Sequence, residues 1–466
     1  MRDDSYQAVM SRRGDIMKAA VGLDYSRFEL GGAAFDYEAM MAAPGLPMEE
    51  IIAIQQAYAI GGTPLMELEN ITRLARSCAA PGMGARILLK DEACNPSGSF
   101  KARRAALSVE TARRIGYKGV VTATSGNYGA AVASCAAKAG LKCIVVQECF
   151  DARGVGQPEI IEKARACEAL GAEVLQLSVG PELFYVFLRV LEDTGYFNAS
   201  LYTPYAILGV QSLGWEIAHQ CREMTGRDPD TVVVTNAGGG NLTGTARGLH
   251  AAGCRPHIAA ASVSLQGLHM ASDGQFNRKS FTTGHTGFGM PFTTWPDRSD
   301  VPRSAARPLR YMDSYWTLSQ GEVFYMTEAL AALEGLERGP AGNTSLAAAF
   351  SLAQQMPQDQ VIVVQETEYT GAGKHHTAQL NFARQNGIKV ALGDPRAEVP
   401  GESIILPQRP ELLQAQAADM AQLRRSLIRN ARKVYPGPLG PEGITFLMEE
   451  TRADRAFVTE QLAQEL

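Results

Sequence analysis

The chain has little of what would build a metal centre or a disulfide framework. Its eight cysteines form no CxxC pair and show no regular metal-ligand spacing. Most lie in apolar segments, where a free cysteine behaves as a small hydrophobic residue. We therefore expect a reduced protein without a bound metal. The cysteines are Cys78, Cys94, Cys135, Cys143, Cys149, Cys167, Cys221 and Cys254.

Long hydrophobic runs and an excess of positive charge are also missing. No apolar run reaches the length that crosses a bilayer, and the opening MRDDSYQAVMSRRGD carries charges where a signal peptide has its apolar centre. The formal net charge of -5 at pH 7 gives no general attraction to nucleic acid. These absences favour a cytoplasmic protein that binds neither membranes nor nucleic acid.

Short apolar runs that alternate with helical stretches dominate what is present. With 466 residues the chain exceeds one ordinary core, so two or more lobes are expected. Continuous apolar strands between helices predict an α/β fold with largely parallel sheets flanked by helices. The expected strands are Ile87–Leu89, Val120–Thr122, Cys143–Val146, Val174–Leu177, Val232–Thr235 and Val361–Gln365.

Three further segments have clear local patterns. Ser319 stands three residues before Glu322 in SQGEVFYMTEALAALEGLE, which predicts a helix with a capping box. The segment Ser272–Pro308 is rich in Gly, Thr, Pro and Arg, so we expect a long loop beside a cleft. From Thr377 onward the sequence is helical in character. In parallel α/β folds, functional sites gather at the carboxyl ends of the strands.

A lysine stands in an unusual loop after the first predicted strand. In NPSGSFKARRA, Lys101 follows Gly98 and Ser99 and precedes a helical run. A buried lysine can lose its proton and form an imine, so this placement suggests a side chain aimed into a cleft. Taken alone, a surface lysine in a Gly/Ser turn is the commoner explanation.

Two other loops after predicted strands suit anions. In TATSGNYG, the hydroxyls of Thr124 and Ser125 lie at a helix N-terminus, where backbone NH groups also point outward. Simple capping by Ser125 or Asn127 is the alternative. In TNAGGGNLTG, the glycines 238–240 let a ligand approach the backbone closely, yet the loop matches neither GxxxxGK[ST] nor GxGxxG. Together the three loops supply what pyridoxal phosphate acting on an amino acid requires.

On these residues the sequence resembles the fold type II, or tryptophan synthase beta-like, family of pyridoxal phosphate enzymes, in its threonine synthase-like branch. The matching segments follow the order of that family. They are GGTPL (61–65), KDEACNPSGSFKARRA (90–105), TSGNYGAAVA (124–133), AGGGNLTG (237–244), GPAGNTSLAAA (339–349) and TGAGK (370–374).

The resemblance implies how the cofactor is held. Lys101 would form an imine with it, and Asn127 would bond its ring hydroxyl. Thr370 fits the position that meets the pyridine nitrogen, although QETEYTGAG has extra residues before the glycine, so Thr367 remains a competitor. Main-chain amides would hold the phosphate at Gly238, Gly239, Gly240, Asn241 and Leu242.

The resemblance also implies a substrate site and a domain plan. Thr124, Ser125 and Gly126 would bind the substrate carboxylate. Apart from the resemblance, the position of Tyr128 directly after Asn127 makes it a candidate to cover the substrate, with simple packing as the alternative. The expected domains are an N-terminal helical extension, a large cofactor-binding domain in two pieces, a small mobile domain and a C-terminal helical extension. Their residues are 1–60, then 61–110 with 200–376, then 111–199, and finally 377–466.

The first thirty residues, the overall length and the segment QETEYTGAGKHH resemble a narrower group, the beta subunits of 2-amino-4-oxopentanoate thiolases of ornithine degradation. That resemblance implies cleavage of the substrate by coenzyme A to acetyl-CoA and D-alanine. It also implies a small alpha subunit as partner and a homodimer of this chain.

Other functions stay open from the sequence. One is threonine synthase-like or dehydratase-like replacement or elimination at the β or γ carbon, and another is a non-catalytic scaffold that kept the fold. A phosphorylated substrate would need cations, and the predicted loop offers Lys279, Arg298, Arg303 and Arg307, unless they form a solvated surface. Cys94 is a candidate nucleophile for acyl transfer, with packing below the lysine loop as the alternative.

Overall fold

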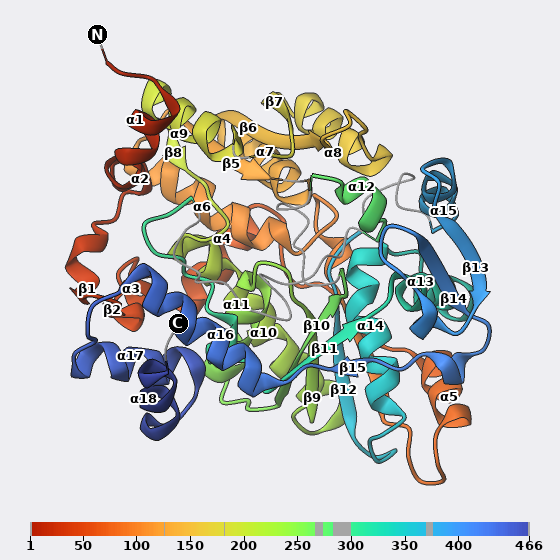
Figure 1. Ribbon diagram of the computed structural model, residues 1–466. Coiled ribbons are helices and arrows are strands. Elements are labelled where there is room, and N and C mark those ends of the chain that lie inside the picture. The colour runs from red at the N-terminus through yellow and green to blue at the C-terminus, as the bar shows by residue number, and fades with distance from the viewer. Residues whose placement is uncertain are drawn as a thin grey trace.

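The computed structural model describes residues 2–124, 126–180, 182–265, 274–282, 300–369 and 376–464. Within these ranges the larger sheet has seven strands in the order β15-β11-β10-β9-β12-β4-β3 (Figure 1). Its five central strands are parallel, and β3 and β15 pair antiparallel at the two edges. The strands are β3 (Leu65–Glu67), β4 (Arg86–Asp91), β9 (Thr231–Thr235), β10 (His257–Val263), β11 (Ser314–Leu318), β12 (Val361–Glu366) and β15 (Gln416–Ala417).

Helices cover both faces of the larger sheet, so its central strands are continuously apolar. Leu88 and Val363 point into the core beneath α6, α10 and α11, whereas Ile87 and Val364 point into the opposite core beneath α5, α13 and α14. The predicted capping box at Ser319 is present at the start of α13. The helices are α5 (Glu69–Cys78), α6 (Lys101–Ile115), α10 (Pro204–Thr225), α11 (Gly240–Ala251), α13 (Gln320–Glu334) and α14 (Pro340–Ala353).

A smaller sheet, all parallel, has the order β7-β6-β5-β8 and lies above the larger one in Figure 1. The helix α6 packs against α7 of this part and against α10 of the larger part. The prediction of an α/β fold with two largely parallel sheets flanked by helices is confirmed. The elements are β5 (Gly119–Thr124), α7 (Asn127–Ala139), β6 (Lys142–Phe150), α8 (Pro158–Ala169), β7 (Glu173–Ser178), α9 (Glu182–Thr194) and β8 (Phe197–Asn198).

Elements from the N-terminal and C-terminal regions of the chain pack on one side of the molecule. The helices α1 and α2 pack on α9, and β2 packs against α17, so the first and last parts of the sequence lie side by side (Figure 1). These elements are α1 (Tyr6–Ser11), α2 (Arg13–Val21), β1 (Glu29–Gly31), β2 (Ala34–Phe35), α3 (Tyr37–Ala42), α4 (Met48–Ala57), α16 (Met420–Val434), α17 (Pro441–Thr451) and α18 (Arg455–Ala463).

The segment expected to be helical from residue 377 onward also contains strands. After α15 (His376–Gln385), β13 (Lys389–Gly393) and β14 (Ser403–Pro407) form a small parallel pair. Ile404 and Leu406 of β14 enter a satellite core with Phe281 and Phe324. Packing against Phe281 and Phe324, which are distant in the sequence, stabilises the strands. The local sequence pattern does not predict this contact.

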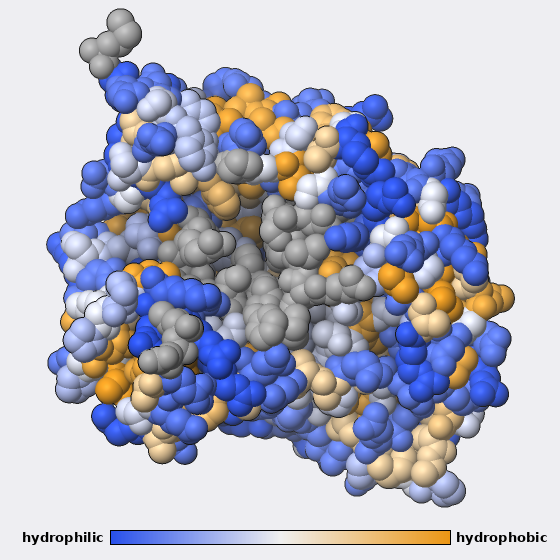
Figure 2. All heavy atoms as spheres, in the orientation of Figure 1, coloured by the Kyte–Doolittle hydropathy of each residue, from blue (hydrophilic) through white to orange (hydrophobic). Residues whose placement is uncertain are grey.

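Of the expected loop Ser272–Pro308 the structure describes 274–282 and 300–308, where a short helix, α12 (Phe276–Lys279), forms. Figure 2 shows a mainly hydrophilic face, with apolar residues among those over β13 and β14, where Leu392 is 74% exposed. None of the helices in the described ranges is long and apolar enough to cross a membrane. All eight cysteines carry free thiols.

Candidate active site

The loop that carries Lys101 is held by the segment that follows β12. The Phe100 backbone NH donates to the Thr367 carbonyl over 3.1 Å, and the Tyr369 NH donates to the Gly98 carbonyl over 2.7 Å. Lys101 is the half-buried first residue of α6, and its Nζ lies 4.7 Å from the centre of the Phe100 ring. The end of β12 therefore determines where the lysine side chain begins.

Gly98 makes this attachment sterically feasible. Its φ of +71° is rarely adopted by other residues, and a Cβ at this position would overlap the Tyr369 carbonyl oxygen. Its NH donates to the Asn95 carbonyl over 2.7 Å. The Asn95 side chain donates to the Glu92 carboxylate over 2.9 Å and accepts from the Gly61 NH over 3.1 Å. The small and polar residues before the lysine thus fix the conformation of its loop.

The second predicted loop connects β5 to α7. Thr124 Oγ1 accepts hydrogen bonds from the Gly126 NH over 2.9 Å and from a further backbone NH in α7, so the hydroxyl shapes the loop itself. Asn127 begins α7, and its side-chain NH2 donates to the Glu368 carboxylate. Its Oδ1 is buried without a partner in the described part of the chain. Ser125 lies outside the described residues.

The glycine loop leads from β9 into α11. Gly239 has a φ of +82°, and a Cβ there would overlap Pro308. The helix begins at Gly240, so its free NH groups face the loop. Asn241 is 6% exposed, and neither polar atom of its side chain has a partner among the described residues, while Leu242 is fully buried. The loop thus presents a polar, unsatisfied surface at a helix N-terminus, which suits an anion.

Contacts through Glu368 and Arg104 connect the three loops. Ser99 and Glu368 form an antiparallel bridge, and the Glu368 carboxylate accepts from Asn127. On the other side of the lysine, Arg104 of α6 faces the glycine loop, because a Cβ on Gly240 would lie 2.6 Å from Arg104 Nη2. The lysine, Asn127 and the glycine loop are therefore parts of one site at the carboxyl ends of β4, β5, β9 and β12.

Two carboxylates at the end of β12 were not predicted. Glu366 is fully buried, and burial raises its pKa well above the usual value. One of its oxygens accepts from the Glu368 NH over 3.3 Å, and the other has no partner in the described ranges. A Cβ on Gly342 would overlap Glu366. The sequence QETE directly after the apolar VIVV was the available signal.

The chemistry of this donor set fits pyridoxal phosphate. The site offers a lysine amine for an imine bond, an unpaired amide oxygen on Asn127 for a ring hydroxyl, and a helix N-terminus with the unpaired Asn241 amide for a phosphate. Buried polar atoms without partners are costly, so their gathering here indicates a polar ligand.

The remaining candidate residues have other surroundings. Tyr128 is 1% exposed in the main core, and burial raises its pKa above the ordinary value, which favours packing over contact with a substrate. Burial and the nearby Asp91 raise the pKa of the Cys94 thiol, which disfavours a thiolate nucleophile. Thr367 is buried beside the lysine loop, and Thr370 lies outside the described residues.

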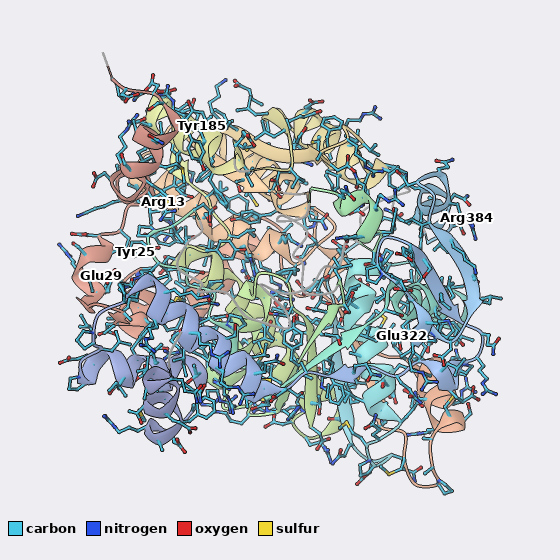
Figure 3. The ribbon with its side chains drawn as sticks, viewed as in Figure 1. Arg13, Tyr25, Glu29, Tyr185, Glu322 and Arg384 are labelled. Carbon is cyan, nitrogen blue, oxygen red and sulfur yellow. The ribbon has the colours of Figure 1, made fainter. Side chains whose placement is uncertain are left out.

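The cations considered for a phosphorylated substrate are mostly engaged elsewhere. Arg303 pairs with Glu29 over 2.7 Å, and Figure 3 shows Glu29 at the N-terminal edge of the molecule. Arg307 is buried and pairs with Glu450 of α17 over 3.2 Å. Both arginines thus bind the terminal regions to the body of the protein. Arg298 lies outside the described residues.

Comparison with known proteins supports the same cofactor. A family model described as pyridoxal-phosphate dependent enzyme matches residues 57–368. The 2-amino-4-ketopentanoate thiolase beta subunit of Acetoanaerobium sticklandii is 67% identical over 458 residues, which are 98% of either chain. A threonine synthase of Halalkalibacterium halodurans is 29% identical over 39% of this chain and 47% of its own. The crystal structure of a T.th. threonine deaminase, 25% identical, superposes with a TM-score of 0.52 over 70% of this chain and 98% of its own.

Proposed function

The chain belongs to the family of pyridoxal-phosphate dependent enzymes, and we propose that it uses this cofactor to cleave 2-amino-4-ketopentanoate with coenzyme A. The products would be acetyl-CoA and D-alanine, as in ornithine degradation. The observation that carries the proposal is the 67% identity to a 2-amino-4-ketopentanoate thiolase beta subunit over 98% of both chains. The lysine and the polar loops of the site described above support the use of pyridoxal phosphate in this reaction.

The proposed reaction breaks one carbon-carbon bond. The coenzyme A sulfur adds to C4, the bond between C3 and C4 breaks, and its electron pair remains on C3, which takes a proton. Bound pyridoxal phosphate supplies an electron sink that stabilises negative charge beside the amino-bearing carbon. The Lys101 amine is the group that carries protons to and from the substrate carbons, since a neutral lysine beside the reacting atoms is an effective base.

Each loop has a proposed binding role. Lys101 holds the cofactor covalently, Asn127 bonds its ring hydroxyl, and Thr370 or Thr367 meets its pyridine nitrogen. The phosphate is bound at Gly238, Gly239, Gly240, Asn241 and Leu242. The substrate carboxylate is bound at Thr124, Ser125 and Gly126, with Tyr128 adjacent.

We also propose an assembly and a domain plan. The relative is named as a beta subunit, which supports a small alpha subunit as partner, and a homodimer of this chain is proposed beside it. Residues 61–110 and 200–376 form the cofactor-binding domain, 111–199 the small mobile domain, and 1–60 and 377–466 the extensions. A cytoplasmic location is consistent with the eight free thiols.

The test is a product assay on the purified chain, with and without the suspected small subunit. It is mixed with 2-amino-4-ketopentanoate and coenzyme A, and acetyl-CoA and alanine are measured together while the cofactor absorbance is followed. Equal amounts of the two products are expected. Lys101→Ala should abolish both, whereas replacement of the exposed Lys118 by alanine should leave them unchanged.

Two other outcomes would redirect the assignment. Cofactor absorbance without acetyl-CoA, even with the small subunit present, would contradict thiolysis and favour threonine synthase-like or dehydratase-like replacement or elimination. Failure to bind the cofactor at all would favour a non-catalytic scaffold.

A further inference from the structure

Arg104 is a buried cation that has no counterion among the described residues. Its side chain is 4% exposed, and the structure records no hydrogen bond or ion pair to its guanidinium within the described residues. The Nε atom is buried and unsatisfied, and the guanidinium carbon lies 5.1 Å from the centre of the Phe100 ring. A buried charge of this kind is strongly unfavourable unless something else neutralises it.

The position of Arg104 indicates what that partner is. It lies three residues after Lys101 on α6, so the two side chains share one face of the helix. Its Nη2 lies 2.6 Å from where a Cβ on Gly240 would be, directly at the N-terminus of α11. Asn241, the next residue of α11, also leaves both polar atoms of its amide unpaired in the described part of the chain. Arginine, amide and helix terminus therefore all face one anion site.

The electrostatic surroundings support this assignment. Burial lowers the pKa of Arg104 to about 10, and no carboxylate contributes to its shift, only the hydroxyls of Tyr128 and Tyr202. The guanidinium therefore still carries its charge at neutral pH. The glycine at position 240 is then explained as well, because any side chain there would push the guanidinium out of the anion site.

We propose that Arg104 binds the phosphate of pyridoxal phosphate, adding a charged side chain to the main-chain amides of the glycine loop. The guanidinium and the NH groups at the start of α11 donate to the phosphate oxygens together, which suits a dianion. The inference rests on the cofactor of the family and not on the proposed thiolysis. Its test therefore measures cofactor binding and leaves the reaction aside.

The decisive experiment compares pyridoxal phosphate with pyridoxal, which lacks the phosphate. Both are titrated into apoprotein of the wild type and of Arg104→Met, and binding is followed by absorbance. The variant should bind pyridoxal phosphate about 10- to 100-fold more weakly, the range for one hydrogen-bonded charge, and should bind pyridoxal as the wild type does. Arg113→Met, at an exposed position on the same helix, is the control and should change neither affinity.

Two results of the titration would overturn the proposal. An equal loss of affinity for both compounds would show that Arg104 only supports the packing of the site. An unchanged affinity for pyridoxal phosphate would show that Arg104 does not contact the phosphate.

A second measurement needs no variant. The phosphorus resonance of the wild-type holoenzyme is followed from pH 5.5 to 8.5, and the bound phosphate should remain a dianion across this range. A phosphate that titrates as it does in free pyridoxal phosphate would contradict a contact with a buried guanidinium.

Discussion

Arg103 and Arg104 are neighbours in the sequence and are both buried, at 0% and 4% exposure, yet they face opposite kinds of surroundings. Arg103 donates to Glu92 and to Glu216, each over 2.7 Å. Burial opposes its charge, but the two carboxylates outweigh this and raise its pKa. No carboxylate in the described ranges pairs with Arg104, and burial lowers its pKa. The first arginine is a structural residue, whereas the second is prepared for a ligand.

The same distinction divides the polar residues around the site into two clusters. In the paired cluster, defined as Lys90, Glu92, Arg103 and Glu216, every charge has a partner inside the protein. In the open cluster, defined as Arg104, Asn127, Asn241 and Glu366, each residue has at least one buried polar atom without a partner in the described ranges. Since buried polar groups are normally satisfied, the open cluster marks where a ligand completes the structure.

The largest expected difference between the clusters is in stability. Arg103→Met would leave Glu92 and Glu216 without their main counterion, so we expect a loss of about 3–5 kcal/mol of unfolding free energy. Arg104→Met would replace an uncompensated cation by an apolar side chain, so the apoprotein should be as stable as the wild type or more stable. Urea unfolding of both apoproteins measures the difference. Equal losses would mean that the two arginines do not differ in kind.

A smaller effect is expected where the lysine loop meets β12. Gly98→Ala forces a side chain onto a residue with φ +71° and onto the Tyr369 carbonyl, so we expect a cost of about 2–4 kcal/mol and weaker cofactor attachment. Gly82 has a φ of +82° but open space where its Cβ would be. Gly82→Ala should therefore cost only about 1–2 kcal/mol and leave the cofactor absorbance unchanged. Similar effects of the two substitutions on cofactor binding would show that the contact with Tyr369 is unimportant.

Sequence patterns predict the strands, helices and loops of this protein. They do not predict which polar residues belong to the paired cluster and which to the open cluster. The strands β4, β9 and β12 could be predicted because both faces are covered and their residues are apolar without interruption. Lys101 and the glycine loop stand out by composition. The sequence KARRA does not distinguish Arg103 from Arg104, because the carboxylates that neutralise Arg103 lie elsewhere: Glu92 directly follows β4, and Glu216 is in α10. Glu366 and Glu368 were missed because their surroundings come from distant parts of the sequence: Glu366 lies against Gly342 of α14, and Glu368 contacts Ser99 and Asn127.

Two asparagines offer a milder test of the same division. The Asn95 side chain bonds both Glu92 and the Gly61 NH, so Asn95→Ala should cost about 1–3 kcal/mol of unfolding free energy. Asn241→Ala removes no hydrogen bond recorded in the described residues and should cost less than about 1 kcal/mol in the apoprotein. Denaturation of the two apoproteins gives these values. In the cofactor titration the order should reverse, with Asn241→Ala binding pyridoxal phosphate more weakly than Asn95→Ala.

The smallest effect we expect is a change in how stability depends on pH. Burial raises the pKa of Glu366 well above its value in the unfolded chain, so the folded protein keeps this proton at pH values where the unfolded chain has released it. The contribution of Glu366 to stability is therefore complete below the unfolded pKa and is lost as the pH rises toward the folded pKa. The Glu366→Gln variant has no carboxyl group at this position, so this contribution to the pH dependence is absent from it.

The variant should lose less unfolding free energy than the wild type between pH 5 and pH 8, when both apoproteins are denatured by urea at each pH. Glu402→Gln, at an exposed position, is the control and should follow the wild type. A variant as sensitive to pH as the wild type would mean that Glu366 is ionised in the folded protein. Because a buried charge needs a counterion, an ionised Glu366 would have a cation as its partner. Glu366 would then belong to the paired cluster.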